Sequence, residues 1–184
     1  MSLAEELAAR AAAAAPAFAR LSDDARGSLL ERIADALDAA ADELVSIAGE
    51  ETALPEARLR GELARTTAQL RKFASVVREG SYLEAIVDHA DPGDTPPRPD
   101  LRRMLRPIGP VAVFAASNFP FAFSVAGGDT ASALAVGCPV IVKTHPGHPR
   151  TSALTASLVS GALAEGGAPA GVFAAIDGFE EGLA

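Results

Sequence analysis

Aromatic residues and cysteine are scarce in this sequence, and their scarcity excludes several kinds of protein. Only 5% of the 184 residues are aromatic, with no tryptophan and one tyrosine, so few flat side chains are available for nucleobases to stack on. The single cysteine, Cys138, excludes a disulfide framework within the chain. A reducing, cytoplasmic setting is the interpretation that fits this count.

Positive charge and long apolar runs are also lacking. The 16 lysine and arginine residues are scattered and outnumbered by 24 acidic residues, which gives a net charge of −8. Nucleic acids and anionic membranes attract clustered basic residues, so neither is expected as a partner. No apolar run is long enough and free enough of charge to span a bilayer, and Glu5 and Glu6 stand where an export signal would be basic.

The first eighty residues have the apolar spacing of amphipathic helices. One stripe begins after Ser22 or Asp23, either of which would cap the helix, and Gly49 and Pro55 bound its expected end. Its apolar members recur at helical spacing: Leu29, Ile33, Leu37, Leu44 and Ala48. A second stripe over residues 59–77 is expected to end at Gly80, because glycine commonly terminates helices.

The second half of the chain alternates apolar runs with helical segments. A loop rich in proline and glycine at residues 91–99 separates the two halves, and a short strand is expected at 101–105. Three predicted strands and two intervening helices follow, in chain order 111–114, 120–136, 138–143, 151–164 and 171–176. The first of these strands is expected to be buried on both faces. This βαβαβ order predicts the first part of a doubly wound, Rossmann-like α/β sheet.

Two loops qualify as sites for chemistry, because ligands of such sheets bind beyond the carboxyl ends of the strands. The first loop runs from Ala115 to Asn118, and the second begins at Lys143. Asn118 would either cap the helix expected at residue 120, which is the commoner role, or donate its amide to a developing oxyanion. Lys143 is either a solvated residue at the end of a strand, again the commoner case, or a donor to a ribose or phosphate.

Three other features in this half are predicted to carry no chemistry. His145 and His148 lie three residues apart, but no third ligand is evident nearby, so no metal site is expected. Gly127 and Gly128 fall inside a predicted helix, where they favour close packing rather than the binding of a phosphate. Cys138 begins a buried strand, and nothing around it supplies a base or an electropositive pocket, so we do not expect it to be a nucleophile.

The segment from Arg106 to Ser152 resembles the aldehyde dehydrogenase superfamily. It reads RPIGPVAVFAASNFPFAFSVAGGDTASALAVGCPVIVKTHPGHPRTS, and it combines Asn-Phe-Pro with Gly-Cys-Pro-Val-Ile-Val-Lys at a specific spacing. Its central part is similar, more narrowly, to the ketoglutarate-semialdehyde (2,5-dioxovalerate) dehydrogenase branch, which is typically NADP-linked. The upstream stretch EETALPEARLRGELARTTAQLRKFA also fits the N-terminal region of the family, so the resemblance covers nearly the whole chain.

The resemblance implies an oxidoreductase that converts a small acidic aldehyde to its carboxylate. In such enzymes a cysteine thiolate attacks the aldehyde, and an Asn amide with a backbone N–H stabilises the oxyanion. Hydride then passes to a nicotinamide, and a water activated by Glu releases the acid. Asn118 falls on the oxyanion Asn. Lys143 falls on the lysine that contacts the adenosine ribose or its phosphate.

The resemblance also implies a cofactor site and a cofactor preference. The expected cofactor-binding residues come from both loops: Ala115, Ala116, Ser117, Lys143, His145 and Pro146. NAD-preferring relatives often carry Glu at the position of Pro146, where its carboxylate accepts hydrogen bonds from both ribose hydroxyls. Proline offers no carboxylate to bind the ribose or to repel a 2′-phosphate, so NADP is the expected cofactor, with NAD as the alternative.

The matching segments do not include the family's nucleophilic cysteine, its glutamate base or the glycine turn that meets the pyrophosphate. We therefore expect the 184-residue chain to be inactive alone, and to be the N-terminal portion of an enzyme that forms a homo-oligomer at full length. The alternatives are a catalytically inactive binding or assembly module of the same fold, and an unrelated Rossmann-type reductase. The missing glycine fingerprint disfavours the reductase.

The predicted domain organisation has three parts. Residues 1–80 form a helical part of the cofactor-binding domain. Residues 81–106 form a loop and strand segment that joins the oligomerisation region. Residues 107–184 form the first part of the Rossmann-like cofactor-binding domain.

Overall fold

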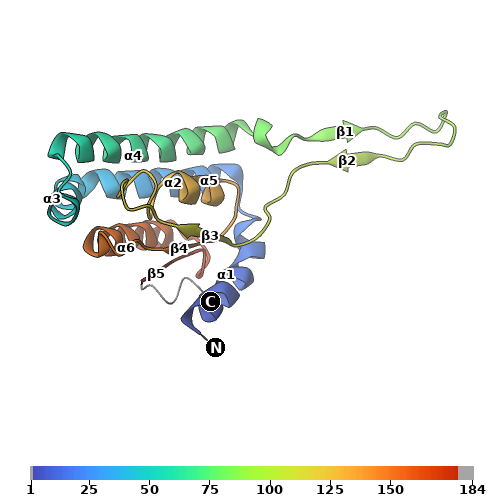
Figure 1. Ribbon diagram of the computed structural model, residues 1–184. Coiled ribbons are helices and arrows are strands. Elements are labelled where there is room, and N and C mark those ends of the chain that lie inside the picture. The colour runs from blue at the N-terminus through green and yellow to red at the C-terminus, as the bar shows by residue number, and fades with distance from the viewer. Residues whose placement is uncertain (1, 178–184) are drawn as a thin grey trace.

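The computed structural model describes residues 2–177, which form a layer of helices, a parallel sheet and a projecting hairpin (Figure 1). The N-terminal helices are α1 (Leu3–Phe18), α2 (Asp23–Ala39), α3 (Ala41–Thr52) and α4 (Glu56–Glu79). The hairpin follows, with the 3₁₀ turn η1 (Ser81–Leu83) and strands β1 (Ile86–Asp88) and β2 (Leu101–Arg103). The sheet region contains β3 (Val111–Phe114), α5 (Gly128–Ala135), β4 (Val140–Lys143), α6 (Pro149–Glu165) and β5 (Phe173–Ile176).

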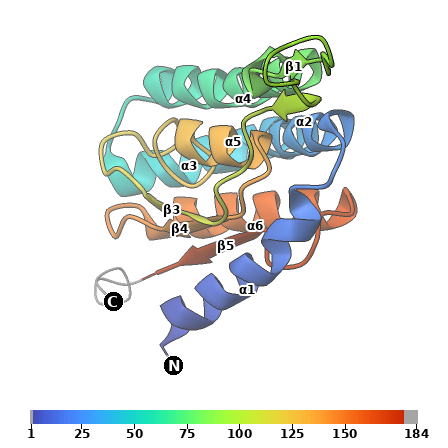
Figure 2. The same ribbon diagram turned by 90° about the vertical axis from the view of Figure 1, so that its right-hand side faces the viewer.

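The parallel sheet has the strand order β3-β4-β5, which confirms the predicted α/β class. Helix α5 connects the first two strands and α6 connects the last two. Both connecting helices lie on one face of the sheet, and α1 lies on the other (Figures 1 and 2). Right-handed crossovers place successive helices on one face when strands are added in one direction, so this arrangement is the expected one.

Helices α2 and α4 pack against each other and cover α5 and α6 (Figure 2). Ser22 caps α2 by accepting the Ala25 N–H at 3.1 Å, and Gly80, with a φ of 84°, ends α4 as predicted. Leu30 and Leu59 are among the fully buried side chains of this layer, and burial of each contributes about 1.5–3 kcal/mol. Among residues 2–177, no helix has the length and apolar character needed to cross a membrane.

The first predicted stripe forms two helices rather than one. Helix α2 gives way to α3 at Ala40, whose φ and ψ are −98° and 14°. Helix α3 packs against α4 and α6, and its residues Leu44 and Ala48 are fully buried. The end of the stripe lies between Gly49 and Pro55 as predicted, because α3 ends at Thr52 and Ala53 adopts the left-handed conformation.

The helix predicted at 120–136 is shorter than expected and begins at Gly128. Residues 120–127 form successive turns instead, and Gly127 is the N-cap of α5. A Cβ atom on Gly127 would lie 2.4 Å from the Ala122 carbonyl oxygen, so only glycine allows the turns to fold back this closely. The glycine pair therefore permits close packing as expected, but at the start of the helix rather than inside it. Helix α6 begins two residues earlier than predicted, and β4 and β5 each begin two residues later.

Strand β3 is not buried on both faces, in contrast to the prediction. Val113 is buried, but Ala112 is exposed and Phe114 is 65% exposed. Strand β3 is an edge of the described sheet, and its outer side chains border an apolar groove of about 1250 Å³. Leu105 and Ile108, from the segment that precedes the strand, line the same groove. The apolar run in the sequence therefore predicted a sheet strand correctly, but it did not predict how exposed the side chains of that strand are.

The hairpin extends away from the helices and the sheet (Figure 1). Its strands are antiparallel, with Ile86 opposite Arg103 and Asp88 opposite Leu101. The loop expected at residues 91–99 forms its far end. The predicted strand at 101–105 is confirmed as the shorter β2, whereas its partner β1 was not predicted.

Candidate functional site

The loops that follow β3 and β4 meet at the carboxyl ends of these strands. The Ala115 N–H donates to the Lys143 carbonyl oxygen at 3.0 Å. The ring of His148 reaches back to the first loop, with its Nε2 atom 2.9 Å from the Ala116 carbonyl oxygen. The structure therefore brings the two groups of candidate residues into one site.

The candidate residues differ in their exposure to solvent. Those at the outer part of the site are exposed: Ser117, Asn118 and Pro146. Those nearer the strands are partly buried: Ala115, Ala116, Lys143 and His145. The methyl side chains of the two alanines leave the backbone of the first loop open to close approach by a ligand.

Asn118 does not cap a helix. Residues 120–127 separate it from α5, and the N-cap position of that helix is occupied by Gly127. The Asn118 carbonyl oxygen accepts a hydrogen bond from Arg58 Nη2 of α4 at 2.8 Å. The interpretation of Asn118 as a helix cap is therefore wrong, and its exposed side chain lies on a loop held by another helix.

Glu62 of α4 binds the backbone of the same loop, and the sequence did not predict this. Its Oε1 atom accepts the N–H groups of Phe121 at 2.8 Å and Ala122 at 2.9 Å, and the residue is only 7% exposed. Buried backbone N–H groups need an acceptor, and this carboxyl group supplies one for both. The sequence feature that could have indicated this role is a glutamate next to Leu63, on the apolar face of a predicted helix.

His148 is fully buried and links the two loops to α6. Its Nδ1 atom lies 3.1 Å from the Ser152 hydroxyl, in addition to the contact between Nε2 and Ala116. A carbonyl oxygen only accepts hydrogen bonds, so Nε2 carries a proton, and in the neutral ring Nδ1 accepts from Ser152. The histidine that the sequence offered only as a poor metal ligand is thus a structural link within the site.

Glu51, at the end of α3, binds the beginning of α6. Its two carboxyl oxygens accept the N–H groups of Arg150 at 2.7 Å and Thr151 at 2.9 Å, together with the Thr151 hydroxyl at 2.7 Å. Burial raises the pKa of Glu51, but the hydrogen bonds from Thr151 and Arg150 outweigh burial and hold the pKa below its ordinary value. These helix N-terminal N–H groups are therefore bound to Glu51 and are not available to an anionic ligand.

His145 contributes hydrogen bonding to the second loop rather than charge. Its Nδ1 atom accepts the Gly147 N–H at 3.0 Å. Burial lowers the pKa of His145, and the proximity of His148 and of the Lys143 ammonium lowers it further. The ring is therefore neutral at neutral pH, and the charge at the end of β4 is that of Lys143.

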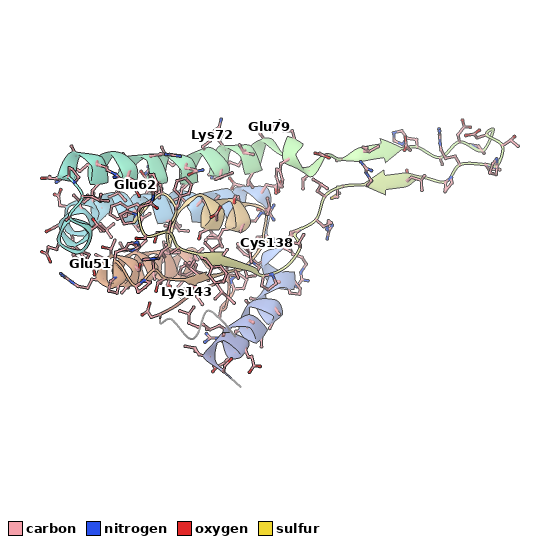
Figure 3. All side chains as sticks on the ribbon, in the orientation of Figure 1. Glu51, Glu62, Lys72, Glu79, Cys138 and Lys143 are labelled. Atoms are coloured by element: carbon pink, nitrogen blue, oxygen red, sulfur yellow. The ribbon has the colours of Figure 1, made fainter. Side chains whose placement is uncertain are left out.

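Cys138 lies far from Asn118. It is buried and precedes β4, whereas Asn118 follows β3, which runs parallel to β4. A four-residue strand separates the two ends of the sheet by about 13 Å, and Figure 3 shows Cys138 and Lys143 towards opposite ends of it. Cys138 and Asn118 therefore lie towards opposite ends of the sheet.

Comparison with known proteins gives the family of this chain. Residues 2–184 match the aldehyde dehydrogenase family. The chain is 57% identical over 155 residues to alpha-ketoglutaric semialdehyde dehydrogenase 2 of Azospirillum brasilense, a match that covers 84% of this chain and 30% of the relative. It is 46% identical over 158 residues to alpha-ketoglutaric semialdehyde dehydrogenase of Acinetobacter baylyi, with 85% and 30% covered.

A solved structure has the same fold. The crystal structure of an E. coli NADP-dependent enzyme superposes with a TM-score of 0.79 at 26% identity, over 96% of this chain and 34% of that one. The chain spans about 30% of the length of the curated relatives it matches. The resemblance seen in the sequence is confirmed by these matches, and the chain belongs to the aldehyde dehydrogenase family.

Proposed function

We propose that this chain is the N-terminal portion of an enzyme that oxidises ketoglutarate semialdehyde, a small acidic aldehyde, to ketoglutarate with NADP. The 57% identity to a ketoglutaric semialdehyde dehydrogenase is the observation that carries this substrate class. The close approach of the Asn118 and Lys143 loops supports a shared site for substrate and cofactor.

Asn118 is the proposed oxyanion donor of this enzyme. A neutral side-chain amide on an exposed, anchored loop can donate a hydrogen bond to a negative oxygen without first reorganising. Cys138 is buried at the other end of the sheet, so the thiol nucleophile and the glutamate base are proposed to come from sequence outside these 184 residues. The 184-residue polypeptide alone is then expected to oxidise no aldehyde.

The proposed cofactor site consists of the residues that both loops contribute: Ala115, Ala116, Ser117, Lys143, His145 and Pro146. The small side chains of the first loop fit close approach by a dinucleotide, and the Lys143 ammonium fits a ribose hydroxyl or a 2′-phosphate. Because Glu51 occupies the first N–H groups of α6, a phosphate at this loop would rely on Lys143. When bound, the cofactor accepts the hydride of the reaction. The structurally similar E. coli enzyme is NADP-dependent, which supports the same preference.

Residues 81–106 are proposed to assemble the enzyme into a homo-oligomer. The hairpin projects from the rest of the chain, and Ile86, Val87 and Leu101 are each about half exposed on it. Exposed apolar side chains on a projecting hairpin favour contact with another protein surface. Residues 1–80 and 107–184 would then together form the first part of the cofactor-binding domain.

The test is an assay of the full-length protein that contains this chain. We expect kcat/KM to be highest for ketoglutarate semialdehyde with NADP, lower for succinate semialdehyde, and lowest for an uncharged aldehyde of similar length. NAD should support slower turnover than NADP at equal concentration. A folded protein that reduces neither cofactor with any of these aldehydes would reject the enzyme and support an inactive module of the same fold.

A further inference from the structure

The loop between β3 and α5 is closed by its own backbone. The Ala116 N–H donates to the Phe123 carbonyl oxygen at 2.8 Å, which joins the two ends of the loop. Further along, the Gly128 N–H donates to the Ala122 carbonyl oxygen at 3.1 Å. These bonds use the carbonyl oxygens of Ala122 and Phe123, but neither involves the Asn118 carbonyl oxygen or the N–H groups of Phe121 and Ala122.

Helix α4 supplies the contacts that the loop itself lacks. Glu62 accepts the N–H groups of Phe121 and Ala122, which lie 59 and 60 residues further along the chain. One turn earlier on the same helix face, Arg58 donates to the Asn118 carbonyl oxygen, and its guanidinium carbon lies 5.4 Å from the centre of the Phe119 ring. Two side chains of one helix therefore hold the loop immediately before and after Phe119 and Pro120.

The two contacts differ in how firmly they hold the loop. Arg58 is exposed, so its hydrogen bond competes with water. Glu62 is 7% exposed and makes two hydrogen bonds to adjacent N–H groups through one oxygen atom. Figure 3 shows its side chain extending from α4 into the interior of the molecule. Glu62 is therefore the principal anchor of the loop, and Arg58 is a secondary one.

We propose that Glu62 is a positioning residue that sets the place of the Asn118 amide through the backbone of residues 118–122. This role rests on the proposed function of Asn118 as the oxyanion donor. A donor accelerates a reaction only when it is held where the negative oxygen develops, and a displacement of about 1 Å lowers the rate strongly. Glu62 touches neither substrate nor cofactor in this role, and acts only through Asn118.

The second carboxyl oxygen of Glu62 suggests a conservative variant. Oε2 is buried and has no hydrogen-bond partner among the described residues, so the loop uses only one of the two oxygens. Glutamine keeps one carbonyl oxygen, which can still accept both N–H groups, and places its NH₂ at the position of Oε2. Leucine has a similar size but no acceptor. Glu62→Gln should therefore retain the anchor, whereas Glu62→Leu should remove it.

The experiment compares these variants in the full-length protein, alone and combined with Asn118→Ala. We expect Glu62→Leu to lower kcat at least tenfold with little change in the KM for NADP, and Glu62→Gln to stay within about threefold of wild type. In the Asn118→Ala background, Glu62→Leu should change kcat by less than about twofold, because the group that it positions is gone. Amide hydrogen exchange in residues 116–124 should accelerate in Glu62→Leu but not in Glu62→Gln.

Two controls separate this role from general stability. Glu51→Leu removes a carboxyl group that also accepts two backbone N–H groups, but at the start of α6, so its effect on kcat should be the same with and without Asn118→Ala. If Glu62→Leu does not fold, Arg58→Ala tests the same anchor from the exposed side and should lower kcat by severalfold. Arg60→Ala breaks only the exposed ion pairs of Arg60 with Glu56 and Asp42, and it should leave kcat unchanged.

The outcomes distinguish the failure of this role from the failure of the proposed function. If Asn118→Ala turns over normally, Asn118 is not the oxyanion donor and both ideas are rejected. If Asn118→Ala is slow but Glu62→Leu has normal kcat, only the positioning role is rejected. The positioning role is equally overturned if Glu62→Leu lowers kcat by the same factor in both backgrounds, or if its loop exchanges no faster.

Discussion

The two loops of the site are each bound by a glutamate from the N-terminal helices, but at different points. Glu62 binds N–H groups in the turns that continue the first loop towards α5, three and four residues after Asn118. Glu51 binds N–H groups that follow the second loop, in the first turn of α6. The first loop is thus held close to Asn118. The second loop is held at its far end, in α6, rather than next to Lys143. If the first loop holds the proposed oxyanion donor and the second loop binds the proposed cofactor, changes in the two loops should have different kinetic effects.

The largest effect should come from removing the amide on the first loop. In the full-length protein, Asn118→Ala should lower kcat by about 10²–10³, because one preorganised oxyanion donor is lost. The KM for NADP should change little, since the second loop is untouched. Asn118→Asp, which keeps the size but lacks the N–H donor, should be as slow. Steady-state kinetics with both substrates varied measures this, and normal turnover by a folded Asn118→Ala protein would contradict it.

Substitutions on the second loop should alter the preference between NADP and NAD more than they alter kcat. Lys143→Ala should shift the preference away from NADP by roughly tenfold or more, because a charge-assisted hydrogen bond is worth about 1.5–3 kcal/mol and each 1.4 kcal/mol is tenfold. Pro146→Glu should act in the same direction, since its carboxylate would bind the ribose and repel a 2′-phosphate. The measurement is kcat/KM for NADP and NAD in each variant. Equal weakening of both cofactors by Lys143→Ala would mean that Lys143 contacts a group they share.

Much of the fold was predictable because it depends on local spacing. The apolar stripes at helical intervals predicted α2 and α4, and the apolar runs predicted the three parallel strands. The rule that ligands bind at strand ends selected two loops that are in fact adjacent. These features repeat over several residues, so no single side chain decides them.

Other features depend on contacts between residues far apart in the sequence. Alanine favours helices, so nothing at Ala40 predicted the break after which α3 packs against α4 and α6. The turns before α5 depend on the approach of Gly127 to Ala122, and the role of Glu62 depends on partners 59 and 60 residues away. The exposure of Phe114 reflects which described elements cover β3, and an apolar run contains no information about that.

His148 links the two loops, so its removal should lower both the stability of the protein and its affinity for the cofactor. Each effect should be smaller than those of the changes at Asn118 and Lys143. His148→Leu leaves the Ala116 carbonyl and the Ser152 hydroxyl without their buried partner, which should lower the free energy of unfolding by about 1–3 kcal/mol. KM should rise by a similar factor for NADP and NAD, because His148 holds the loops and does not read the 2′-phosphate. Ser152→Ala, which removes only the Nδ1 partner, should show a smaller loss in the same denaturant titration. A change in the NADP preference of His148→Leu would instead indicate direct contact with the cofactor.

The smallest effect should come from Glu51, and it should depend on pH. The hydrogen bonds from Thr151 and Arg150 hold the folded-state pKa of Glu51 below its ordinary value of 4.5, so the ionised group stabilises the folded protein above that pH. Glutamine offers one acceptor oxygen and turns an NH₂ towards a backbone N–H, so Glu51→Gln should lower the free energy of unfolding at pH 7. Because the group is partly exposed, the decrease should be no more than about 1 kcal/mol. Below pH 4.5 the unfolded chain binds the proton more readily, and the advantage of wild type should disappear as the pH falls through the folded-state pKa. Thermal melts of both proteins from pH 7 to pH 3 measure the difference in Tm, which should narrow on the acid side. Curves that stay parallel over this range would show that the contact between Glu51 and α6 does not depend on the ionised carboxylate.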